Sequence, residues 1–120
     1  MVKKILDEKK ICIPEVKDIL DKVYARMEKL GGTMVPDPFT EATYEYVHNF
    51  SKMDADVARN IINMLMKEYN MDESYAIQVA NIDPNYPQEV KVILEKDPIL
   101  RDLNEDELAV MIQNIRDLQG

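Results

Sequence analysis

Histidine, cysteine, tryptophan and glycine are scarce in this sequence, and the shortage of His and Cys removes two classes of function. The 120 residues include one His, one Cys, three Gly and no Trp. A nucleophile of the Ser/His/Asp or Cys/His kind needs a base within reach, and a structural zinc site needs four ligands, mostly Cys and His. His48 and Cys12 alone supply neither. The sequence therefore predicts no catalytic residue, no cofactor and no metal ligand.

The single cysteine also excludes an internal disulfide, so nothing points to an oxidising compartment. No apolar run approaches the ~20 residues of a transmembrane helix. Met1–Leu6 is followed at once by the charged Asp7–Lys10 rather than by the apolar segment of a signal peptide. We expect a cytoplasmic protein with no membrane partner. Cys12 should be a small packed apolar residue, and His48 should lie at the boundary of the core.

Acidic residues outnumber basic ones, and their distribution is uneven. The chain has 15 Lys and Arg against 23 Asp and Glu, a net charge of −8. Residues 1–30 carry a balance of +2, and residues 31–120 carry −10. Because phosphate neutralisation supplies most nonspecific affinity for nucleic acid, the acidic part should bind protein. We expect no small-molecule substrate, and any RNA contact should come mainly through a partner.

The first 30 residues predict a short β arm followed by a helix. Val2–Leu6 and Ile11–Ile13 are β-prone runs, too short to be stable alone. Pro14 favours a helix start, and Gly31-Gly32 favours its end. Apolar residues between them recur at three- and four-residue steps, namely Val16, Ile19, Leu20, Val23, Met27 and Leu30. This stripe has no obvious place in a small bundle, so something else should cover it.

Residues 31–38, rich in Gly and Pro, predict a linker, so the expected divisions are 1–30, 31–38 and 39–120. Five helices are expected after it, at about 39–51, 54–69, 72–81, 87–96 and 104–118. The first should turn Thr43, Tyr44, Val47 and Phe50 inward. Asn70 suits a left-handed helix end, Asp83-Pro84 should break a helix, and Asn104 with Glu107 predicts a capping box. The fold class is thus mainly α, with a short β arm.

The ordered signals from Tyr44 to Leu94 are the most specific part of the sequence. They comprise a tyrosine-bearing helix reaching Phe50-Ser51-Lys52, a helix carrying Ala58 and Ile61, the corner Val79-Ala80-Asn81-Ile82-Asp83-Pro84, and Glu89-Val90 leading to Ile93-Leu94. This order resembles the helical stalk subunit of archaeal DNA-directed RNA polymerase, the counterpart of the fourth subunit of eukaryotic RNA polymerase II. The resemblance implies that residues 39–120 form a helical domain similar to the HRDC fold.

The resemblance also implies a function. Such a subunit is a non-catalytic part of DNA-directed RNA polymerase. It binds a second stalk subunit that contains an OB-type barrel, which we call the OB-containing subunit, and through it the polymerase core. The heterodimer forms a stalk near the RNA exit channel and supports initiation, elongation and termination, with RNA bound chiefly by the OB-containing subunit. The implied partner-binding residues lie in the arm and the first helix, namely Val2, Ile5, Ile11, Ile13, Val16, Ile19, Leu20, Val23 and Met27.

Two other functions stay open on sequence alone. A stand-alone HRDC-like module would bind nucleic acid, but the balance of −10 over residues 31–120 counts against it. An unrelated acidic helical adaptor would explain the charge and the missing catalytic groups, but not the ordered match. Co-purification with an OB-containing polypeptide and large polymerase subunits would discriminate among the three.

Overall fold

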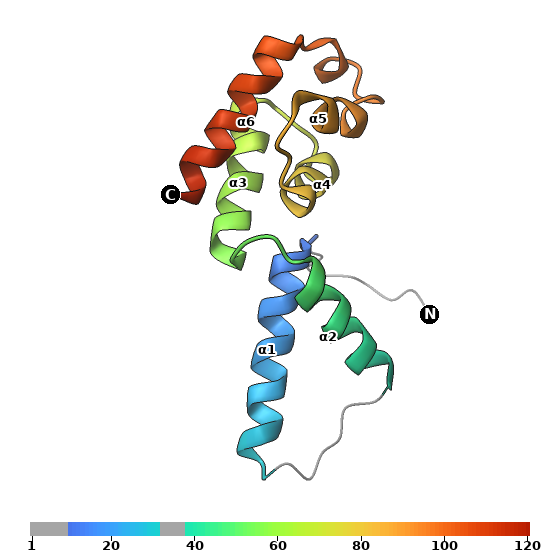
Figure 1. The fold of residues 1–120 in the computed structure, drawn as a ribbon, viewed down its shortest axis with the longest axis vertical. Helices are drawn as coiled ribbons and strands as arrows, with labels where there is room; N and C mark the ends of the chain where they lie inside the picture. The colour runs from blue at the N-terminus through green and yellow to red at the C-terminus, as the bar shows by residue number, and fades with distance from the viewer. Residues whose placement is uncertain (1–9, 32–37) are drawn as a thin grey trace, which may run out of the picture.

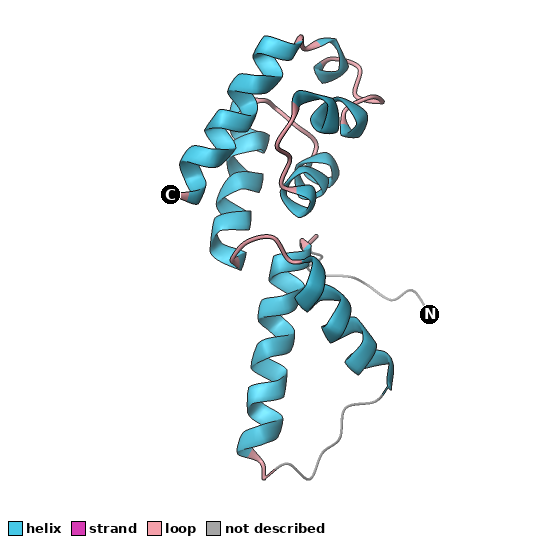
Figure 2. Ribbon diagram, viewed as in Figure 1, coloured by secondary structure: helices cyan, strands magenta, loops and turns pink. Residues whose placement is uncertain are grey.

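Helices and their connections make up all of the protein that the structure describes. The computed structural model describes residues 10–31 and 38–120. Its elements are α1 (Ile13–Lys29), α2 (Pro38–Phe50), α3 (Ala55–Glu68), α4 (Glu73–Ile82), α5 (Pro87–Ile93), the 3-10 turn η1 (Leu100–Asp102) and α6 (Glu105–Gln119). No strand occurs in these ranges (Figure 2). The predicted class, mainly α with about five helices after residue 38, is confirmed.

The predicted strand at Ile11–Ile13 is wrong, because Ile13 is already the first residue of α1. Pro14 presets the backbone angle of the first helical turn. The Cys12 backbone N–H donates to Glu15 Oε1 at 3.1 Å, which satisfies a donor that the helix itself leaves unpaired. The predicted strand at Val2–Leu6 and most of the predicted linker lie outside the described residues.

The molecule is elongated and has two parts (Figure 1). Helices α3 to α6 pack together, while α1 and α2 lie side by side and extend away from them. The radius of gyration is 17.3 Å, against about 14 Å for a compact domain of this length. The division of the chain at 31–38 stays a prediction, and α2, which follows that division, lies beside α1.

The core is apolar and belongs mostly to α3, α4 and α6. Ile61, Ile62 and Leu65 of α3 are fully buried, because they fall on one face of the helix at three- and four-residue steps. Apolar side chains of α6 at three- and four-residue steps are also buried, namely Leu108, Met111, Ile112 and Ile115. Leu118, one turn further, is 40% exposed.

Several predicted helix ends are confirmed. Asn70 and Asp83 adopt left-handed backbone conformations, with φ of 51° and 52°. In the capping box of α6, Glu107 N–H donates to Asn104 Oδ1 at 2.8 Å, and Asn104 N–H donates to Glu107 Oε1 at 3.2 Å. Helix α5 ends at Ile93, three residues before the predicted end, and a turn follows it.

The Asp83-Pro84 corner is held by the last helix. Arg116 Nη1 donates to Asp83 Oδ1 at 3.0 Å, and Arg116 Nη2 donates to the Pro84 carbonyl at 2.9 Å. Gln119 Nε2 also donates to Asp83 Oδ1, at 2.8 Å. These bonds tie the end of α4 to α6, so the corner motif that stood out in the sequence has a structural role.

Leu65→Ala should lower the free energy of unfolding by about 2–5 kcal/mol, because it leaves a cavity in a fully buried site. Urea unfolding followed by circular dichroism measures the change. Leu118→Ala is the matched control, since it removes the same atoms from a side chain that is 40% exposed. Equal losses from the two variants would contradict this assignment of the core.

Candidate protein-binding surface

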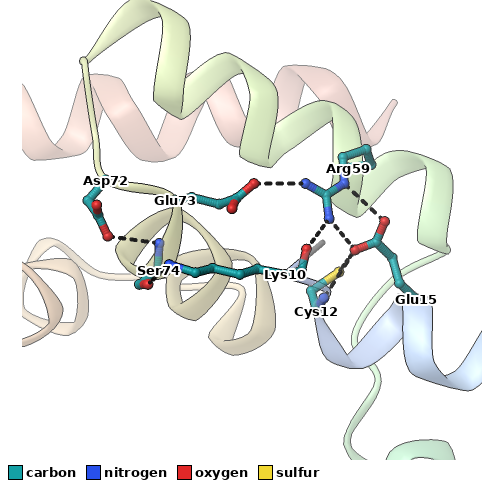
Figure 3. A network of polar contacts seen from close by, with 7 residues as sticks. All are labelled: Lys10, Cys12, Glu15, Arg59, Asp72, Glu73 and Ser74. Atoms are coloured by element: carbon teal, nitrogen blue, oxygen red, sulfur yellow. Dashed lines mark hydrogen bonds and ion pairs between the residues drawn. The ribbon is translucent and has the colours of Figure 1, made fainter. Parts of the chain in front are cut away.

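An ion pair joins the start of α1 to α3 (Figure 3). Arg59 Nε donates to Glu15 Oε2 at 3.0 Å, and Arg59 Nη2 donates to Glu15 Oε1, so the pair is bidentate. Arg59 Nη2 also donates to the Lys10 carbonyl at 3.0 Å. Glu73 of α4 lies 3.8 Å from Arg59 Nη1. Bidentate arginine–carboxylate pairs fix direction as well as distance, so this contact sets the angle at which α1 leaves the bundle.

Further bonds attach the first turn of α1 to α4. The Ile13 backbone N–H donates to Asn81 Oδ1 at 2.8 Å, and Lys10 Nζ donates to Ser74 Oγ at 3.1 Å. The Cys12 side chain is 1% exposed and belongs to the core cluster. Together with the Glu15–Arg59 pair, these contacts form what we call the α1 junction.

Cys12 is the small packed residue that the sequence predicted. Burial raises the pKa of its thiol to about 11. The backbone contact with Glu15 lowers this pKa, but by less than burial raises it. The Sγ donates to Glu15 Oε1 at 3.3 Å. Since the thiolate is the reactive form, the folded chain keeps Cys12 unreactive at neutral pH.

Glu15 is charged although it is largely enclosed, with 12% of its side chain exposed. Burial alone would raise the pKa of its carboxyl, but hydrogen bonds from Arg59 and from the Cys12 backbone N–H outweigh burial and lower the pKa to about 2. The sequence alone assigned no partner to Glu15. The available signal was Arg59, a cation directly after the core residue Ala58 on α3.

Helix α2 covers one side of α1. The rings of Tyr24 and Tyr44 lie 4.4 Å apart, and Tyr44 Oη donates to Asp21 Oδ1 at 2.8 Å. Val47 is buried, as predicted. Phe50 was predicted to face inward, which is wrong: it is 49% exposed, with its ring against Tyr46. His48 is exposed rather than at the core boundary.

A row of apolar side chains on α1 stays uncovered by the described residues. Ile19, Val23 and Leu30 are 49%, 38% and 60% exposed; we call them the α1 apolar edge. Of the other predicted binding residues, Ile11 is 38% exposed, Val2 and Ile5 lie outside the described residues, and the remainder are half-buried, namely Ile13, Val16, Leu20 and Met27. Phe39, at the start of α2, was not among the predicted binding residues and is 81% exposed.

The described residues offer little that suits chemistry. No three His, Cys, Asp or Glu side chains in residues 10–31 and 38–120 gather closely enough to hold a metal ion. A groove of about 290 Å³ lies between the starts of α1 and α3, but its lining residues include Asp18, Asp21 and Asp54 with no base–nucleophile pair. None of the described helices has the length and apolar character that crossing a bilayer requires. The uncovered apolar edge on α1 fits protein binding better than any other use.

A family model described as RNA polymerase Rpb4 matches residues 10–119, nearly the whole chain, including α1 and its junction. No curated protein matched the sequence.

Glu15→Gln should destabilise the folded chain in a pH-dependent way. Because folding lowers the pKa of Glu15 from 4.5 to about 2, its charge contributes stability that is fully present above pH 4.5 and is lost as pH falls toward 2. The difference in unfolding free energy between wild type and Glu15→Gln should therefore shrink across this range. Urea unfolding at several pH values measures it, and a difference that does not change from about pH 6 to about pH 2.5 would rule out the charged pair.

Arg59→Gln should open the α1 junction and expose the Cys12 thiol. Removing one member of an enclosed ion pair leaves the other charge uncompensated, so the rate of Cys12 alkylation at neutral pH should rise at least about tenfold, because the thiolate forms more readily once it is solvated. Arg101→Gln, at an exposed position in η1, is the control and should leave the rate unchanged. Unchanged reactivity in Arg59→Gln would show that the junction does not depend on this pair.

Proposed function

The chain belongs to the RNA polymerase Rpb4 family, and on this premise we propose that it pairs with the OB-containing subunit through α1. Family membership makes it a non-catalytic subunit of RNA polymerase that belongs to the stalk. The finer proposal concerns the partner, the heterodimer and the surface that forms it. We further propose an archaeal type of subunit that acts in the cytoplasm near the RNA exit channel and supports initiation, elongation and termination.

The observation that carries the proposal is the α1 apolar edge. Ile19 and Val23 lie on a helix that projects from the bundle, and Leu30 directly follows its last residue. Helix α2 covers only one side of that helix. Apolar side chains in such a row are stabilised when a partner removes them from water, by about 25 cal/mol per Å² of apolar surface buried. Val2 and Ile5 precede this helix and complete the proposed binding segment.

The charge distribution supports a division of labour with the partner. The balance of −10 over residues 31–120 opposes contact with phosphates. We propose that the OB-containing subunit binds most of the emerging RNA, and that this chain positions and stabilises that partner on the polymerase core. In this account the nucleotidyl transfer chemistry belongs to the large subunits.

Ile19→Asp combined with Val23→Asp should abolish pairing with the OB-containing subunit, because two carboxylates would lose water without gaining partners, at a cost of several kcal/mol. Co-expression followed by affinity capture of the tagged partner measures pairing. Circular dichroism should show that the helical fold survives, since both side chains are exposed in the free chain.

Val92→Asp combined with Val110→Asp is the matched control. These valines are 70% and 58% exposed on α5 and α6, away from α1, so this variant should pair normally. Normal recovery of the partner with the Ile19/Val23 variant would refute the proposed surface. Loss of pairing in the control alone would move the interface to the bundle.

The chain alone should bind single-stranded RNA weakly at physiological salt, whereas the heterodimer should bind it measurably. Such binding is driven by the release of counterions when basic residues neutralise phosphates. A chain with a net charge of −8 releases few counterions in this way. Titration of fluorescently labelled RNA with each form makes the comparison. Tight, strongly salt-dependent binding by the chain alone would favour the nucleic-acid module instead.

A further inference from the structure

The uncovered side of α1 carries two parallel rows of different chemistry. The apolar edge, Ile19, Val23 and Leu30, runs along the helix at intervals of four and seven residues. A second row consists of basic residues at intervals of four and three positions, namely Lys22, Arg26 and Lys29. Each of them is within four positions of a residue of the apolar edge. Residues at such intervals share a helix face. We call the second row the α1 basic row; it lies directly beside the edge.

The basic row is exposed and mostly uncommitted. Lys22 pairs with Asp18 at 3.1 Å, but 77% of the Lys22 side chain remains exposed. Arg26 and Lys29 are exposed, and neither forms an ion pair with any residue in the described ranges. Basic residues in a last turn stabilise a helix through its dipole. That effect accounts for Arg26 and Lys29, but it gives no reason for Lys22 or for the alignment of all three beside the edge.

The row also stands out against the charge of the whole protein. Residues 31–120 have a balance of −10, whereas residues 1–30 have +2. Within residues 13–29 four basic and four acidic residues cancel. A partner with acidic side chains is therefore repelled by most of this chain, and on α1 it is attracted at the basic row alone. Charge arranged in this way selects the orientation of an encounter and raises the association rate more than it raises the final affinity.

We propose that α1 docks into an apolar groove on its protein partner whose rim carries Asp or Glu side chains, with the apolar edge in the groove and the basic row against the rim. This inference rests on the proposed function and adds the chemistry of the surface that α1 recognises. A protein is favoured over RNA because the residues beside the row are aliphatic. Binding of single strands relies instead on aromatic side chains that stack bases.

Reversing the charge of Arg26 and Lys29 to Glu in the full chain tests the proposal. Stopped-flow mixing with the OB-containing subunit at low salt should show an association rate at least about tenfold slower than wild type. The deficit should shrink as salt rises to several hundred millimolar, because salt screens exposed charges. Reversal of Lys91 and Lys96 is the matched control: both are exposed lysines on or after α5, and their reversal changes net charge equally. It should slow association less than about twofold.

Each outcome has a definite meaning. Equal slowing by both reversals would overturn the proposal, because overall charge would then explain the effect. The proposal would also be overturned if the Arg26/Lys29 variant associated at the wild-type rate and its heterodimer bound RNA more weakly. The basic row would then bind RNA phosphates. If wild type pairs with the OB-containing subunit and the Ile19/Val23 variant does not, a failure of the charge test concerns this inference alone. If wild type does not pair with that partner, the proposed function fails with it.

Discussion

The bidentate ion pair between Glu15 and Arg59 is the contact on which the rest of this structure depends. It joins residues 44 positions apart and fixes the start of α1 against α3, while Cys12 enters the core beside it. The first turn of α1 thereby becomes part of the bundle. The remainder of α1 projects outward from this junction, so the junction sets the direction in which its uncovered side points (Figure 1).

The two parts of the molecule satisfy their apolar residues differently. The α3–α6 part forms a core of its own, with Ile61, Ile62 and Leu65 fully enclosed, and leaves surface residues such as Val92 and Val110 exposed. The α1–α2 part encloses fewer apolar side chains, through the Tyr24–Tyr44 contact and Val47. Because the first part supplies its own core, exposed apolar residues on the second do not threaten the fold. A stable bundle joined to an α1–α2 part with exposed apolar residues is expected of a subunit that binds another protein through that part.

Prediction from sequence succeeded where local interactions decide the structure. The positions of the helices, the capping box at Asn104, the left-handed end at Asn70 and the helix break at Asp83-Pro84 follow from the preferences of neighbouring residues. It failed where distant contacts decide. Ile11–Ile13 looks like a strand until the bond from Ile13 to Asn81 and the entry of Cys12 into the core are seen. Phe50 continues the apolar pattern of its helix but is 49% exposed. The α1 junction was missed because neither Glu15 nor Arg59 reveals its partner in sequence.

The central claim is that α1, held by its junction, is the surface by which this chain joins its partner. Amide hydrogen exchange, followed by mass spectrometry on the chain alone and in complex with the OB-containing subunit, tests it most directly. The account predicts added protection on binding over residues 13–29, with little change over α3, α4 and α6, whose amides the core already protects. Protection confined to the outer face of α5 and α6, with α1 exchanging equally in both states, would contradict it.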